Sequence, residues 1–140
     1  MLRRSLAALL AAVALTACGD GSTGPHGTIE GTYTLTTVNG KAPPYMYYQD
    51  DFETDELMAG TLTIHSGNTF SDVITTRYTV SGSVTTSSVT CTGTFTRTGD
   101  SITFEEATTN DCGGTFVGTW NRGNSMTVAL DATAQAVFKK

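Results

Sequence analysis

Apolar and polar positions alternate along most of this chain, and turn residues interrupt the alternation at short intervals. The clearest unit covers residues 93–104, where the alternation continues on both sides of a Gly99-Asp100 turn. Period-two alternation around such a pair is typical of a β-hairpin. A similar unit follows at residues 118–128, and a weaker one comes earlier at 60–70. The pattern therefore predicts an antiparallel meander built from one repeated hairpin.

The alternation predicts eight short strands, and no segment keeps the 3.6-residue period of a helix for three turns. A meander hides its edges most simply by closing on itself. We therefore predict an all-β protein, an eight-stranded antiparallel up-and-down barrel with at most one short helix. The positions expected to face the interior are Leu62, Ile64, Phe70, Ile74, Tyr78, Val80, Val89, Cys91, Gly93, Phe95, Ile102, Phe104, Cys112, Gly114, Phe116, Gly118, Trp120, Met126, Val128, Leu130, Ala134, Ala136 and Phe138.

One stretch, residues 42–59, breaks the alternation and concentrates aromatic and acidic side chains. Loops of this length in small domains are usually functional or disordered. We predict a long loop here, with a short helix over residues 51–58, and a second polar loop or wide hairpin end at 81–88. The candidate ligand- or partner-binding residues are Tyr45, Tyr47, Tyr48 and Phe52. The alternative is that these tyrosines plug one end of the barrel.

The chain opens with two arginines and an apolar run over residues 5–15, which has the form of a secretory signal. The run is shorter than the roughly 20 residues that span a membrane. Leu15-Thr16-Ala17-Cys18 resembles the lipobox of bacterial lipoproteins, whose cysteine is lipidated and becomes the N-terminus. The alternative is an ordinary cleaved signal followed by an unrelated cysteine. We predict a lipoprotein signal peptide (1–17), lipidated Cys18 with a flexible tether (18–27), and a barrel domain (28–140).

The lipobox resemblance implies a lipid-anchored protein of the cell envelope. Gly19, in place of an aspartate after the cysteine, implies sorting to the outer membrane, where we expect the protein to face the periplasm. Loss of Arg3 and Arg4 with the signal peptide would lower the net charge from −5 to −7. So acidic a chain is poorly suited to bind nucleic-acid phosphates or an anionic lipid surface. We therefore expect no nucleic-acid partner, membrane attachment through the N-terminal lipid only, and a monomer.

If Cys18 carries the lipid, Cys91 and Cys112 remain as an even pair in an oxidising compartment, which indicates a disulfide. A full-length strand between theirs would separate the two α-carbons by about 9.6 Å, beyond disulfide reach. The intervening strand must therefore end near Glu105 or Glu106. The alternative, a metal site, lacks support because the chain has no C-x-x-C motif and no second histidine in its folded part.

Gly31-Thr32-Tyr33, at the start of the first strand, resembles the G-x-W that opens lipocalins, with Tyr in place of Trp. The long stretch after that strand is where lipocalins place the lid over their cavity. The pattern of residues 93–104, with a closing Val137-Phe138-Lys139, is similar to small bacterial lipocalin-like lipoproteins. The resemblance covers roughly residues 28–140 and implies a calycin-type barrel. The chain lacks the family's C-terminal helix, and its Phe-rich interior predicts that any cavity is small.

The sequence offers little catalytic chemistry. The folded part has one histidine, His65, which the alternation directs into water, and Glu105 and Glu106 point to opposite faces of a strand. Nucleophile-elbow, zincin and phosphate-loop motifs are missing. We therefore predict no enzyme, no catalytic residue, no metal and no cofactor.

Two binding functions remain. In the first, a small apolar ligand occupies the barrel or its mouth, because small barrels can hold one ligand and aromatic-lined pockets are common ligand sites. In the second, the barrel is filled, and the tyrosine-rich and acidic stretch binds another envelope protein, as an inhibitor or scaffold would. The two differ in whether a void opens beneath residues 45–52.

Overall fold

A computed structural model describes residues 28–109 and 111–140, so the predicted signal peptide, Cys18 and tether lie outside the described residues. The described residues contain no helix long and apolar enough to cross a membrane. They form nine strands: β1 (Gly31–Val38), β2 (Tyr45–Gln49), β3 (Glu53–Ile64), β4 (Thr69–Val80), β5 (Ser83–Thr98), β6 (Ser101–Glu106), β7 (Thr115–Trp120), β8 (Ser125–Ala129) and β9 (Gln135–Lys139).

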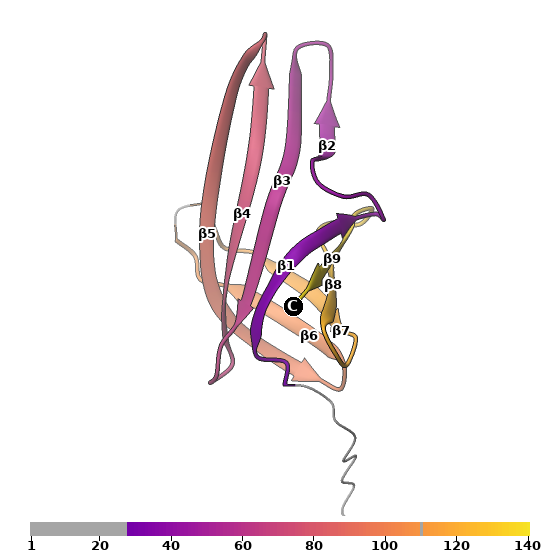
Figure 1. Ribbon diagram of the computed structural model, residues 1–140. Coiled ribbons are helices and arrows are strands. Elements are labelled where there is room, and N and C mark those ends of the chain that lie inside the picture. The colour runs from indigo at the N-terminus through magenta and orange to yellow at the C-terminus, as the bar shows by residue number, and fades with distance from the viewer. Residues whose placement is uncertain (1–27, 110) are drawn as a thin grey trace, which may run out of the picture.

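Eight of these strands close into an antiparallel barrel (Figure 1). Strands β3 to β9 pair in chain order, β9 pairs with β1, and β1 returns to pair with residues 61–64 of β3. Closure leaves no free edge around the barrel itself. The predicted all-β, eight-stranded antiparallel barrel is confirmed.

Aromatic side chains fill one end of the barrel, which we call the closed end. Phe70 and Phe104 are buried in edge contact, with ring centroids 5.0 Å apart, and Phe116 stacks on Phe104 at 4.7 Å. Burying each large apolar side chain stabilises the fold by about 1.5–3 kcal/mol. The predicted interior positions that are buried are Leu62, Ile64, Phe70, Cys91, Phe95, Ile102, Phe104, Gly118, Trp120, Met126, Val128, Ala134, Ala136 and Phe138.

Strands β2 to β5 continue past the barrel as a projecting sheet (Figure 1), which consists of β2 with residues 53–58, 75–80 and 83–88. Strand β2 takes the place of β1 beside β3, next to a β-bulge between Leu57 and Ala59. Bulges bend a strand and are common at barrel rims. A two-residue turn at Ser81-Gly82, both with positive φ, joins β4 to β5, as tight hairpins require.

The structure corrects two sequence predictions in this region. The predicted loop at 42–59, with its helix at 51–58, is instead β2, a short turn and the first half of β3. The loop or wide hairpin end predicted at 81–88 is instead a tight hairpin, a two-residue turn followed by β5. Apolar alternation marks a strand with one buried face, and both faces of the projecting sheet contain exposed side chains such as Tyr47 and Val84. These strands therefore lacked the signal on which the prediction depended.

A disulfide joins Cys91 to Cys112, with their α-carbons 5.6 Å apart, as predicted. Strand β6 ends at Glu106, so the chain leaves the sheet before it reaches Cys112. The disulfide thus attaches the segment between β6 and β7 to β5.

Candidate functional site

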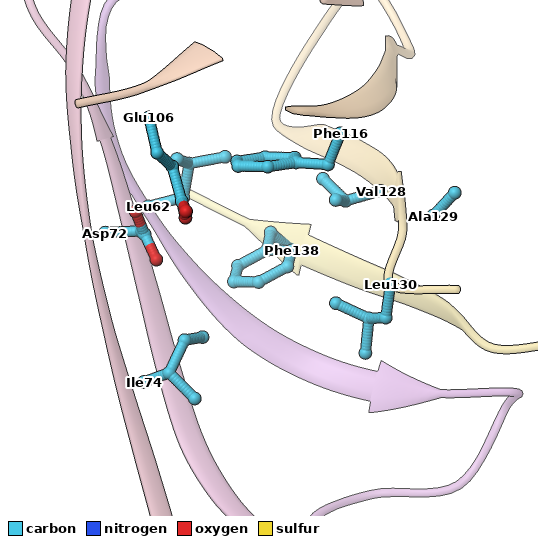
Figure 2. A pocket seen from close by; sticks show the side chains of 9 residues that line it. All are labelled: Leu62, Asp72, Ile74, Glu106, Phe116, Val128, Ala129, Leu130 and Phe138. Carbon is cyan, nitrogen blue, oxygen red and sulfur yellow. The ribbon is translucent and has the colours of Figure 1, made fainter. Parts of the chain in front are cut away.

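The barrel end from which the projecting sheet extends is called the open end. A groove starts inside this end and continues beneath the projecting sheet. Its inner pocket, about 160 Å³, is drawn in Figure 2 and is lined by Leu62, Asp72, Ile74, Glu106, Phe116, Val128, Ala129, Leu130 and Phe138. Its outer pocket, about 260 Å³, is lined by Tyr45, Tyr47, Leu57, Ile74, Thr76, Leu130, Asp131 and Ala134. Ile74 and Leu130 line both pockets, so the two adjoin.

The walls of the groove are fixed by the turn between β8 and β9 and by one asparagine. Asp131 Oδ1 accepts hydrogen bonds from the backbone N–H groups of Thr133 and Ala134, which shapes the turn below Leu130. Asn39 donates from Nδ2 to the Tyr45 hydroxyl at 3.2 Å and to the Thr133 carbonyl at 3.1 Å. A single side chain therefore connects β2 to the β8–β9 turn across the outer pocket.

The structure brings three of the four predicted binding residues to one face of the projecting sheet. Tyr45 and Tyr47 line the outer pocket. Tyr48 pairs with Asp55 on the same face, and its hydroxyl donates to Asp50 Oδ2 at 2.9 Å. Phe52, which is 73% exposed at the tip of the sheet, lines neither pocket.

The tyrosines do not plug the barrel. Tyr47 and Tyr48 are 53% and 47% exposed, whereas the closed end is filled by phenylalanines. Tyr47 and Tyr48 therefore do not close the barrel, and the half-buried Tyr45 packs against the edge of the core. A void does open beneath them, in the form of the outer pocket.

The face of the projecting sheet that holds Tyr45, Tyr47 and Tyr48 is called the tyrosine face below. Acidic side chains gather on it, further out along the sheet. A hydrogen bond to Glu53 raises the pKa of Tyr78, and backbone N–H groups, with the Tyr48 hydroxyl, lower the pKa of Asp50. The cation of this region, Arg77, is on the opposite face, where it pairs with Glu56 at 2.6 Å. The tyrosine face is therefore negatively charged.

Asp72 is the site residue that sequence analysis missed. It lies between Phe70 and Ile74 on the inward face of β4 and is only 9% exposed. Its Oδ1 atom is buried and has no hydrogen-bond partner among the described residues. The sequence did offer one sign of this burial, because Asp72 lies midway between two apolar residues that both face inward in the alternation.

Glu106 of β6 directs a second carboxylate into the same inner pocket (Figure 2). Its Oε2 accepts hydrogen bonds from the backbone N–H groups of Gly113 and Gly114, at 3.0 and 2.9 Å. Its neighbour Glu105 lies on the other face of the strand, as predicted, and is exposed to solvent. The acidic partner of Glu106 comes instead from another strand, because oxygens of Asp72 and Glu106 and the Cys91 Sγ lie within 4.8 Å of one another.

The pKa of Asp72 is raised from its ordinary value of 3.8 to about 6. The main cause is burial of the carboxyl group, and the second is the nearby Glu106 carboxylate. Ionisation of Asp72 therefore opposes folding. This cost is absent below about pH 4, develops as the pH rises from 4 to 6, and is complete above pH 6. One pKa unit corresponds to about 1.4 kcal/mol, so the full cost is of the order of 2–3 kcal/mol.

We therefore expect Asp72→Asn to stabilise the protein at pH 8 by about 1–2 kcal/mol, the new amide being imperfectly hydrogen-bonded. At pH 4 the gain should vanish. Urea unfolding of both proteins at the two pH values measures this difference. A gain of equal size at both pH values would show that the carboxyl charge is not its cause.

No protein-family model matches the chain, and no curated protein matches it significantly. The fold agrees with the calycin-type barrel implied by the resemblance to lipocalins, while membership of that family is not shown. What the structure defines is a closed eight-stranded antiparallel β-barrel with a groove at its open end.

Proposed function

We propose that the protein is a lipid-anchored binding protein of the cell envelope that holds a small apolar ligand in the groove at the mouth of its barrel. The observation that carries the proposal is the position of the groove between the filled closed end and the tyrosine face. Ligand sites are usually concave, mostly apolar and about 300–1,000 Å³ in volume. Each pocket alone is smaller than that, so the ligand is expected to span both.

A slender molecule fits this shape best. Each methylene group moved from water into the apolar groove contributes about 0.8 kcal/mol, so a chain of about ten carbons gains roughly 8 kcal/mol before the cost of association. In the outer pocket, Tyr45 and Tyr47 offer flat apolar rings whose hydroxyl groups can stay hydrated. The tyrosines therefore suit the exposed end of such a ligand.

Native mass spectrometry of the protein purified from its own host tests the proposal. We expect the wild type to retain a small molecule and Leu130→Lys to lose it, because the new charge enters both pockets. Val84→Lys, on the exposed projecting sheet away from the groove, is the matched control and should retain the ligand. Absence of any bound small molecule, or equal retention by Leu130→Lys, would count against a ligand in the groove.

Replacing Tyr45, Tyr47 and Tyr48 together with serine should abolish retention of the ligand at little cost in stability. Tyr47 and Tyr48 are half-exposed, so the loss should be about 1–2 kcal/mol, mostly from the half-buried Tyr45. Truncating a buried aromatic residue costs about 3–5 kcal/mol each. Urea melts therefore report whether the tyrosines support the fold, and a drop of that larger size would contradict a binding role.

Lipid anchoring is the part of the proposal that depends on Cys18. Changing Cys18 to serine should move the protein from the membrane fraction to the soluble periplasm, because a diacylated or triacylated cysteine supplies the apolar anchor. Cell fractionation followed by immunoblotting measures this. A variant that still sediments with membranes would show that the lipobox prediction is wrong.

A second candidate function, binding of a basic envelope protein, is favoured by the tyrosine face. Tyrosine is enriched at protein interfaces, and Asp50, Glu53 and Asp55 would steer a positively charged partner. Co-purification of a protein that dissociates at high salt, with the groove empty, would support this function over the first.

A further inference from the structure

We propose that the inner pocket recognises a protonated amine, so that the ligand is an amphipathic organic cation. Its ammonium group would lie between Asp72 and Glu106. Its apolar part would follow the groove outward past Ile74 and Leu130. This inference rests on the proposed binding function and adds the chemical class of the ligand.

The first support is the unpartnered oxygen of Asp72. A buried polar atom without a hydrogen bond is costly and uncommon in folded proteins. Asp72 Oδ1 is such an atom, and Asp72 lines the inner pocket. A donor brought by a ligand would satisfy it from the pocket side. Figure 2 shows that the Asp72 and Glu106 carboxylates are turned toward each other at one side of this pocket.

The second support is the spacing of the two carboxylates. Their facing oxygens lie within 4.8 Å of each other, so a nitrogen slightly off the line between them can be about 2.8 Å from both. That is the length of a charge-assisted hydrogen bond, and an ammonium group has three donors to share. A cation between them also removes the repulsion of two like charges. Because two backbone N–H groups fix Glu106, the pair is positioned before the ligand arrives.

The rest of the lining favours an organic cation over a metal ion. Cys91 Sγ, the third group near the carboxylates, is in a disulfide and is not a free thiolate. Calcium takes six to eight oxygen ligands, whereas Phe116 and Phe138 bring carbon to the same pocket. An amphipathic amine matches both parts of the groove, because its ammonium group suits the carboxylates at the inner end and its apolar chain suits the walls beyond them. Among the described residues that line the groove, none is a lysine or arginine that would repel it.

Asp72 also lowers the stability of the empty protein, which a purely structural residue would not be expected to do. Its ionised form destabilises the empty barrel, and departures of this kind are expected at functional sites. Binding an ammonium group would remove much of that penalty. The same side chain should therefore weaken the empty protein and strengthen its complex.

Calorimetric titration of the full chain with Cys18→Ser, which carries no lipid and needs no detergent, tests the proposal with three probes of equal length: decylammonium and decanoate, each below its micelle concentration, and decanol, below its solubility limit. We expect decylammonium to bind about tenfold or more tightly than decanol, and decanoate to bind most weakly. Asp72→Asn should lower decylammonium affinity to that of decanol and leave decanol binding intact. Glu106→Gln should act in the same direction. Glu105→Gln, which removes the same charge on the outer face, is the matched control and should change nothing.

The outcomes separate the two proposals. If decanol binds but decylammonium binds no more tightly, or if Asp72→Asn keeps the preference for the amine, the cationic ligand is wrong and the binding function stands. If none of the three probes binds, the binding function itself fails. A titration with calcium chloride alone is the last arm. Calcium binding that Asp72→Asn abolishes and that displaces decylammonium would assign the carboxylates to a metal and overturn the amine.

Discussion

Replacing Gly93 with alanine should destabilise the barrel by about 3 kcal/mol or more, because overpacking inside a well-packed core costs 1–3 kcal/mol and more when the backbone is involved. A Cβ at this position would overlap the carbonyl oxygen of Glu105 and lie 2.7 Å from a ring carbon of Phe70. Gly93 pairs with Glu106 between β5 and β6, so the strands cannot separate to make room without losing hydrogen bonds.

Gly114→Ala is the matched control for this prediction. A Cβ added at Gly114 would lie 3.5 Å from its nearest neighbour, Glu106 Oε2, which is an ordinary contact distance. Urea unfolding should show a large fall in the midpoint for Gly93→Ala and little change for Gly114→Ala. Equal midpoints for the two variants would show that the β5–β6 pairing is looser than described.

Removing the disulfide, with Cys91→Ala and Cys112→Ser together, should cost about 3 kcal/mol in the chain-entropy account, since the bond closes a loop with a sequence separation of 21 residues. The bond also holds the segment that presents the Gly113 and Gly114 amides to Glu106. Its loss should therefore weaken ligand binding as well as the fold.

Urea unfolding with and without reductant measures the disulfide effect. The wild type should lose stability when reduced, and the double variant should be insensitive to reductant. Thiol titration of the denatured, unreduced mature protein should find no free cysteine at these two positions. A wild type with the same midpoint in both conditions would contradict a stabilising role.

Sequence analysis predicted those parts of the fold in which one face of a strand is buried. The hairpin that pairs Phe95 with Phe104 is present in the expected register. The disulfide was predicted from the even pair of cysteines in an oxidising compartment, and strand spacing showed where β6 must end for the two to meet. In both cases local pattern and barrel geometry require the same arrangement.

The projecting sheet was not predictable in the same way. Residues 53–58 and 83–88 pair as strands while much of their surface stays in solvent, so nothing selects apolar side chains at every second position. The tyrosines were found by their composition alone. Which face they share depends on β2 pairing with β3, a contact that the sequence pattern does not reveal.

Asp72 was missed for a different reason. Its position in the alternation is inward, but acidic side chains are rarely buried, so the interior positions predicted from the sequence do not include it. Glu106 was weighed only against Glu105, its neighbour in sequence, whereas the barrel brings it beside a carboxylate 34 positions earlier on β4. Sites built across strands need the register, and only the structure supplies it.

An apolar ligand is expected to occupy the groove at the open end of the barrel. The most direct measurement is a set of ¹H–¹⁵N spectra of the full chain recorded during a titration with decanol. We expect the largest shifts at Tyr47, Ile74 and Leu130, with little change at Arg77 and Val84 on the opposite face of the projecting sheet. Shifts centred on that opposite face, or none at all at saturating decanol, would contradict it.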